Sequence, residues 1–156
     1  MSIDPEFVKS ALPQSVPMVA TLNLSFRDLS LEQAVMVLPD QVAFHNHVGG
    51  PHAGAMFTLA ESASGALILA NFGDVLDRVV PLAVSAEIRY LKLALGEVTA
   101  TATMGSSAAA VLAELDSGQR PELLIDVALT DAGGVATGHM TIRWTLKPLR
   151  GKPVQS

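Results

Sequence analysis

The sequence predicts an α+β fold in which an antiparallel sheet wraps around one long central helix. The helix is predicted because residues 53–71 have helical periodicity, whereas the stretches on either side alternate in the manner of strands. The later strand-like stretches follow one another without a second long helix, which favours antiparallel pairing. Small side chains recur along the helix and would let strands approach it closely: Gly54, Ala55, Ala60, Ala63, Ser64 and Gly65.

The elements before the helix are predicted from prolines, glycines and alternation. Residues 4–12 are expected to form a short helix, and Pro13 and Pro17 mark an irregular stretch after it. Residues 18–30 and 33–40 alternate in part and predict two strands. The segment HNHVGGP, residues 45–51, predicts a loop, because glycine and proline favour turns with unusual backbone angles.

The helix has one apolar face, made of Met56, Leu59, Ala60, Ala63, Leu67 and Ala70, and Gly73 is expected to stop it. The same criteria predict the remaining elements: strands over 82–94, 97–105 and 122–131, a short helix over 107–119, and a terminal hairpin over 133–149. We expect one domain over residues 18–150. Residues 1–17 form a separate N-terminal segment with the short helix, and its DPEF stretch is open to interpretation as a tag remnant.

Composition restricts the class of protein and its partners. Of 156 residues, 49% are apolar and only 16% are charged, well below the usual quarter. A chain this apolar has more apolar surface than a small monomer easily buries, so a homodimer or homotetramer is expected. The net charge of -5 and the absence of a Lys/Arg cluster argue against a nucleic-acid partner.

Targeting signals and cysteine chemistry are also restricted. The N-terminus has early acidic residues and no signal-peptide core, and the longest apolar run, 53–73, is interrupted by Glu61, so no membrane partner is expected. With no cysteine, the chain has no disulfide, thiolate metal site or cysteine nucleophile, which fits a cytoplasmic location.

Glu61 is the side chain that most needs an explanation. It is the only acidic or basic residue between His52 and Asp74, and it lies among alanines, leucines and a phenylalanine. A lone charge in apolar surroundings is costly. Read as a structural residue, Glu61 is either solvated on the outer face of the helix or paired with a buried arginine.

The segment around it resembles a known signature. Asn46, Gly49, His52, Gly54 and FTLAES (57–62) are similar to the motif of hotdog-fold thioesterases of the phenylacetic-acid-pathway (PaaI-like) type. There an N-x-x-G-x-x-H-G-G segment leads into a helix with an acidic residue nine positions after the histidine, and both spacings match. A looser similarity to this family covers most of residues 18–148. The chain also resembles hotdog domains of unknown function. Two positions differ: Ala53 replaces a glycine, and YLKLA (90–94) lacks the proline of the family's YLRPA.

The resemblance implies a hotdog fold and an acyl-coenzyme A, or related thioester, hydrolase. Glu61 would act as general base or as nucleophile, while Asn46 and His52 orient the water or the thioester carbonyl. The backbone amides of Ala53 and Gly54, at the positive start of the helix, are expected to bind the oxyanion. Four further residues are expected to assist substrate binding, the last two by meeting nucleotide phosphates: Ser64, Ser85, Arg89 and Lys92.

Helix geometry separates these groups within one chain. Glu61 lies about 12–14 Å along the axis from the helix start, at 1.5 Å per residue. That is too far for Glu61 to act on an atom held by the same N-terminus. The resemblance implies that the acid and the oxyanion donor come from different subunits, which agrees with the expected oligomer.

Several alternatives remain open at this point. The domain could be a non-catalytic acyl- or ligand-binding hotdog domain, or a dehydratase of 3-hydroxyacyl thioesters that pairs His52 with Glu61. His52 could cap the helix and Asn46 could satisfy its own loop. His45, His47 and His52 lack a dependable ligand spacing, so we expect no metal, and no motif implies a cofactor.

Overall fold

The computed structural model describes residues 3–150 of the chain. Its helices are α1 (Pro5–Ser15), α2 (Pro17–Thr21), α3 (Ala53–Phe72) and α4 (Ala108–Asp116), with two short 3-10 helices, η1 (Val42–Phe44) and η2 (Gly73–Val75). Its strands are β1 (Ser25–Leu29), β2 (Gln33–Leu38), β3 (Val79–Tyr90), β4 (Val98–Met104), β5 (Glu122–Asp131) and β6 (Ala136–Pro148).

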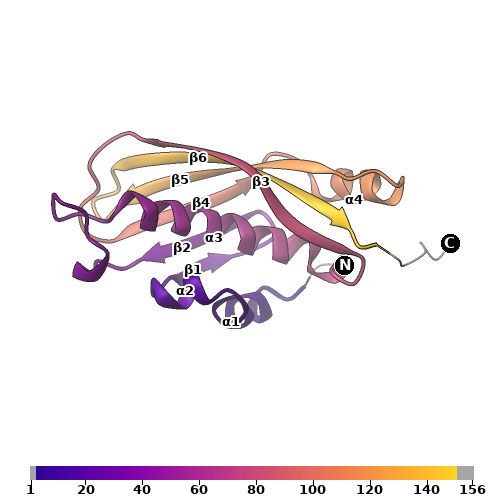
Figure 1. Ribbon diagram of the computed structural model, residues 1–156, viewed down its shortest axis with the longest axis horizontal. Coiled ribbons are helices and arrows are strands. Elements are labelled where there is room, and N and C mark those ends of the chain that lie inside the picture. Colours follow the sequence, from indigo (N-terminus) through magenta and orange to yellow (C-terminus); the bar gives the residue numbers. More distant parts are fainter. Residues whose placement is uncertain (1–2, 151–156) are drawn as a thin grey trace.

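The strands form one antiparallel sheet that curves around α3. Their order across the sheet is β1-β2-β4-β5-β6-β3, and every neighbouring pair is antiparallel. Figure 1 shows α3 running along the inside of this sheet, with β4, β5 and β6 on one side of it and β1 and β2 on another. The expected α+β fold, with a sheet around one long helix, is confirmed.

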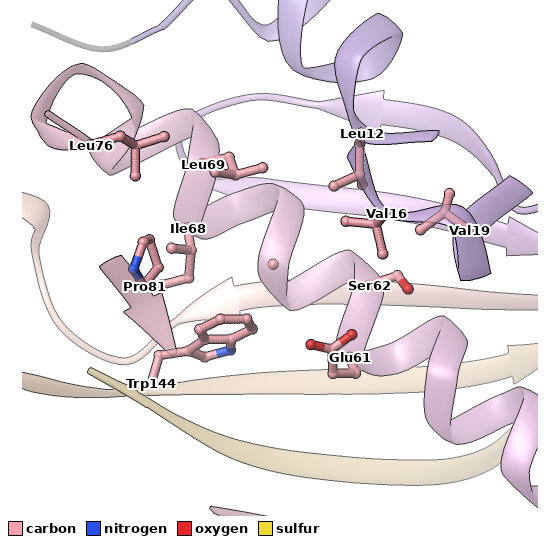
Figure 2. Close-up of a pocket in the computed structure, with 11 residues that line it drawn as sticks. Leu12, Val16, Val19, Glu61, Ser62, Ile68, Leu69, Leu76, Pro81 and Trp144 are labelled. Carbon is pink, nitrogen blue, oxygen red and sulfur yellow. The ribbon is translucent and has the colours of Figure 1, made fainter. Parts of the chain in front are cut away.

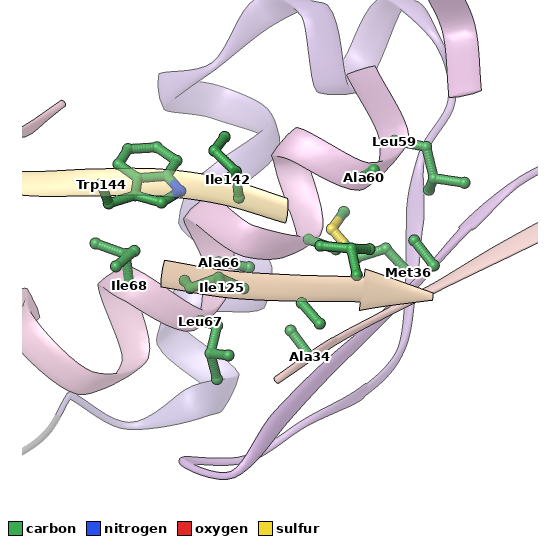
Figure 3. Close-up of a cluster of buried hydrophobic side chains, with 14 of the residues drawn as sticks. Ala34, Met36, Leu59, Ala60, Ala66, Leu67, Ile68, Ile125, Ile142 and Trp144 are labelled. Carbon is green, nitrogen blue, oxygen red and sulfur yellow. The ribbon is translucent and has the colours of Figure 1, made fainter. Parts of the chain in front are cut away.

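The core lies between α3 and the inner face of the sheet. In β5 the alternation predicted from the sequence turns Leu123, Ile125, Val127 and Leu129 inward, and all four are buried. Figure 3 shows Leu59, Ala60 and Leu67 of α3 within the same cluster as Ile125 and Ile142. Complete burial of a leucine or isoleucine side chain contributes about 1.5–3 kcal/mol. The small residues Ala60 of α3 and Ala100 of β4 are both fully buried, which permits the close approach expected between helix and sheet.

Helix α3 begins and ends close to the predicted limits. His52 is its N-cap, and the helix continues one residue past the predicted end, after which Gly73 begins η2. By length and composition alone, Ala53–Val75 would suffice to cross a membrane, but 61% of its most apolar window is buried inside the fold. The core helix of a globular protein has the same length and composition and is buried in the same way, so this feature is weak evidence for a membrane span.

The first predicted strand is wrong over residues 18–21. Pro17 is the first residue of α2, a position where its missing N–H and fixed φ suit a helix. The chain then turns at Asn23, whose φ is +53°, and β1 starts only at Ser25. The partial alternation of residues 18–24 therefore reflects a short helix and a turn, with Val19 and Leu22 buried.

Helix α1 and strand β3 also differ from the prediction in their limits. Helix α1 includes Pro13 and runs to Ser15, where the predicted helix stopped at residue 12. Strand β3 starts three residues earlier than predicted and ends at Tyr90, so residues 91–94 form a loop.

The N-terminal helices contribute to the core. Val8 and Leu12 of α1 and Val19 of α2 are buried, and both helices contact α3. Asp4 caps α1 by accepting a hydrogen bond from the Glu6 N–H. The first two residues of the predicted N-terminal segment lie outside the described part of the chain.

Candidate active site

Glu61 borders an apolar pocket of about 240 Å³. Its carboxylate is partly buried, and desolvation by burial raises the pKa of Glu61 above the ordinary 4.5. Within residues 3–150 it makes no ion pair and no side-chain hydrogen bond, so a buried arginine partner is absent there. Gly65 lines the pocket with the residues labelled in Figure 2: Leu12, Val16, Val19, Ser62, Ile68, Leu69, Leu76, Pro81 and Trp144.

The pocket follows one stripe of α3. Glu61, Gly65, Ile68 and Leu69 recur at the spacing of neighbours on a helix surface, so they share one face. Gly65 has no side chain, and an added Cβ there would lie 3.6 Å from the Trp144 ring. The absence of a side chain at Gly65 therefore leaves room between the helix and Trp144.

Trp144 is held in place by Ser64. The indole Nε1–H donates to Ser64 Oγ over 3.0 Å, and this hydroxyl donates to the Glu61 carbonyl oxygen over 2.7 Å. Ser64 is fully buried. The structure thus places Ser64 one step behind the pocket, where it orients the indole that lines it.

Asn46 organises the loop before α3. Its Oδ1 accepts hydrogen bonds from the backbone N–H groups of Val48 and Gly50 at 3.0 and 3.1 Å, and its Nδ2 donates to the Pro51 carbonyl at 3.4 Å. Gly49 has a φ of +78°, a conformation that glycine adopts without strain. The Asn46–Gly49 spacing therefore has a structural reason in this loop.

His52 caps the helix through its ring. Its Nδ1 accepts a hydrogen bond from the Gly54 N–H at 2.8 Å. The Gly54 amide, expected to bind an oxyanion, is thus engaged. The Ala53 N–H has no hydrogen-bond partner within the described residues, and it points from the positive end of the helix.

Tyr90 joins the end of β3 to the start of α3. Its hydroxyl donates to the Ala53 carbonyl over 2.9 Å, and burial raises the pKa of Tyr90. Sequence reasoning did not single out this residue. Only its position at the end of a predicted strand, in the YLKLA segment, hinted at a role.

The expected site residues fall into separate places in one chain. Asn46, Ala53 and Lys92 line a pocket of about 360 Å³ together with Tyr90. His52 and Gly54 line another of about 360 Å³, which α2 and the 3-10 helix η1 border. Neither of these pockets includes Glu61.

Ser85 and Arg89 lie on β3, one of the two edge strands of the sheet, and both are exposed. Arg89 pairs with Glu87 of the same strand at 3.1 Å. Ser85 follows a bulge in the pairing with β6. The structure does not bring either residue to the Glu61 pocket.

Four histidines occur in the chain, and histidine is a common metal ligand. Over residues 3–150, no group of three or more His, Cys, Asp or Glu side chains is placed to hold a metal ion. His45 instead contacts Asp40, with 2.6 Å between Nε2 and Oδ1.

Similarity to known proteins extends over nearly the whole chain. A family model described as a domain of unknown function (DUF4442) matches residues 5–146. A Pseudomonas aeruginosa protein of unknown function, described as a probable thioesterase, has a TM-score of 0.83 at 24% identity, and the match covers 96% of this chain and 99% of that one. No curated relative matches the chain.

Two further solved structures are similar. A mutant thioesterase from Pseudomonas aeruginosa has a TM-score of 0.75 at 20% identity, covering 96% of this chain and 97% of that one. The PaaI protein of the phenylacetic acid degradation operon of E. coli has a TM-score of 0.72 at 14% identity, covering 95% of each chain. The expected hotdog fold is thereby confirmed, as is the resemblance to hotdog-fold thioesterases and to a hotdog domain of unknown function.

Proposed function

The chain belongs to the DUF4442 family, here a hotdog-fold domain, and from this premise we propose that it hydrolyses acyl thioesters such as acyl-coenzyme A. One observation carries the proposal: Glu61, a partly buried carboxylate with no side-chain partner among residues 3–150, faces an apolar pocket. A carboxylate with a raised pKa is a stronger base than an ordinary one, and an apolar pocket beside it suits an acyl group.

In the proposed reaction Glu61 accepts a proton from a water molecule. The water oxygen attacks the thioester carbonyl carbon and forms a tetrahedral oxyanion. When this intermediate collapses, the C–S bond breaks, and the leaving thiolate takes up the proton, giving a carboxylic acid and a free thiol. As a nucleophile instead, Glu61 would attack the carbonyl itself and form an anhydride, which water then hydrolyses.

The Ala53 amide is the proposed oxyanion donor. In the described part of the chain its N–H has no acceptor, whereas the Gly54 N–H already donates to His52. Asn46 fixes the loop that leads into the helix, so it acts through the position of Ala53. Lys92 lines the same pocket, where an ammonium group suits the phosphates of a nucleotide.

A second copy of the chain is required for this site. Glu61 and Ala53 lie in different pockets of one chain, and Glu61 follows Ala53 by two turns of the helix. Strand β3 ends the sheet on one side and exposes Val80, Leu82 and Val84 at 39, 41 and 47%. We propose a homodimer, or a homotetramer of two dimers. In it, Glu61 of one subunit and the Ala53 amide of another form one active site.

A screen of purified protein against short, long and aromatic acyl-coenzyme A substrates tests this function. Release of free thiol supports the thioesterase. A gain of enoyl absorbance from a hydroxyacyl substrate without thiol release would instead identify a dehydratase. Binding of acyl-coenzyme A with neither signal would identify a non-catalytic binding domain.

A further inference from the structure

Ser62 is a buried hydroxyl without a partner. Only 4% of the residue is exposed, and its Oγ is the one buried side-chain polar atom in the described residues that has no hydrogen bond. The other buried polar side chains, Ser64, Asn71, Thr137 and Thr145, all make hydrogen bonds. Leaving such a group unsatisfied costs about 1–3 kcal/mol.

Ser62 lines the same pocket as Glu61. In Figure 2 the Glu61 carboxylate faces the side of Trp144, whereas Ser62 lies on the side of Val16 and Val19. These two valines offer no hydrogen-bonding side chain. Since Ser62 lines the pocket, a molecule that fills the pocket is the candidate partner for its hydroxyl.

The pocket has the size of a medium acyl group. An apolar cavity of about 150 Å³ holds benzene, and this one measures about 240 Å³. Its helical stripe from Glu61 to Leu69 spans about 12 Å at 1.5 Å per residue, and Leu76 and Pro81 border it beyond Ile68. Since Glu61 and Ser62 are adjacent, the Ser62 hydroxyl lies at the carboxylate end of this stripe.

We propose that this pocket takes the acyl group of a medium-chain thioester bearing an oxygen substituent near the thioester carbon, and that Ser62 donates a hydrogen bond to that oxygen. The inference rests on the proposed function, whose substrate class it narrows to hydroxyacyl or ketoacyl thioesters. A hydroxyl among apolar walls favours an oxygen-substituted acyl chain over an unsubstituted one, because the unsubstituted chain leaves the buried serine without a hydrogen bond. Ser62 is on this account a specificity residue, and Glu61 performs the chemistry.

The test compares octanoyl-coenzyme A with β-, γ- and δ-hydroxyoctanoyl-coenzyme A. We expect kcat/KM of the wild type to favour the best hydroxylated isomer by about tenfold, the scale of one hydrogen bond. Ser62→Ala should lower kcat/KM for the hydroxylated isomer about tenfold more than for octanoyl and so remove this preference, and Ser62→Thr, which keeps a hydroxyl, should restore part of it. Ser10→Ala, on the exposed surface of α1, is the matched control and should change neither substrate.

Two results would overturn the inference. If Ser62→Ala lowers kcat by the same factor on all substrates, Ser62 holds the attacking water instead. If the wild type shows no preference among the isomers and octanoyl, the buried hydroxyl is structural.

A binding measurement separates failure of this inference from failure of the proposed function. Trp144 is the single tryptophan and lines the pocket, so its fluorescence reports occupancy without any hydrolysis. Tighter binding of a hydroxyoctanoate than of octanoate, lost in Ser62→Ala, supports the inference even if no thiol is ever released. Equal binding of both acids contradicts it even if the protein is an active thioesterase.

Discussion

Replacing Gly65 by alanine should stabilise the protein and at the same time narrow its acyl range. Gly65 lies in the interior of α3, in the face that lines the Glu61 pocket. The nearest atoms to an added Cβ are two carbons of the Trp144 ring, each 3.6 Å away. That separation is an ordinary van der Waals contact, so the methyl group fits without displacing the indole.

The size of the stability effect follows from helix propensity. Alanine is more favourable than glycine inside a helix by about 0.8–1.0 kcal/mol. For a chain of 156 residues, this corresponds to a rise in Tm of about 2–4 °C. No backbone strain opposes the change, since Gly65 has an ordinary helical conformation.

Although Gly65→Ala should raise stability, it should lower kcat/KM for large acyl groups. One methylene more or less in a hydrophobic pocket is worth roughly 10–200-fold in kcat/KM. We therefore expect Gly65→Ala to lower kcat/KM at least tenfold for the largest accepted acyl group and to leave acetyl-coenzyme A unaffected. Leu69→Ala, which widens the same pocket, should shift the preference toward longer chains.

Thermal melting and a thiol-release series across acyl lengths measure both effects. A Gly65→Ala protein that melts higher but keeps the wild-type order of substrates would show that the acyl group binds elsewhere. A lower Tm would show that the space between Gly65 and Trp144 is not as the structure has it.

Three further predictions concern Ser64, Asn46 and the pH response of Glu61. Ser64→Ala leaves the Trp144 N–H buried without its acceptor, so the free energy of unfolding should fall by about 1–3 kcal/mol, measured by denaturant titration. Asn46→Ala removes two accepted hydrogen bonds in the loop and should lower kcat about tenfold as Ala53 is displaced; an unchanged kcat would separate the loop from catalysis. Because burial raises the pKa of Glu61 above 4.5, ionisation destabilises the folded state: Glu61→Gln should melt like the wild type below about pH 4.5 and higher than it once the pH exceeds the folded-state pKa.

The fold could be predicted because its signals are local or periodic. The alternation in β5 comes from burial on one face of the strand. The predicted apolar face of α3 is buried as well, although burial extends around most of the helix. Residues 18–21 were misassigned because a one-turn helix between two turns leaves too short a pattern to distinguish from a strand. Pro17 was the available signal, since proline commonly starts a helix.

The site could be predicted only in part, for a physical reason. The spacing of Asn46, His52 and Glu61 depends on one continuous segment, and the structure gives each residue a defined place in that segment. The wall that faces Glu61 comes from α1, α2 and β6, at distances in sequence where no periodicity operates. The bonds from Trp144 to Ser64 and from Tyr90 to Ala53 depend on the same long-range packing.

The most direct test of the central claim is the turnover of Glu61→Gln on the best acyl-coenzyme A, measured as thiol release beside the wild type. Glutamine keeps the size of the side chain and removes the base, so kcat should fall about a hundredfold or more, the scale of general-base loss. The variant should remain folded, because an uncharged amide is no harder to bury than a carboxylate. If the folded variant retains near-normal turnover, Glu61 is structural and the proposed mechanism is wrong.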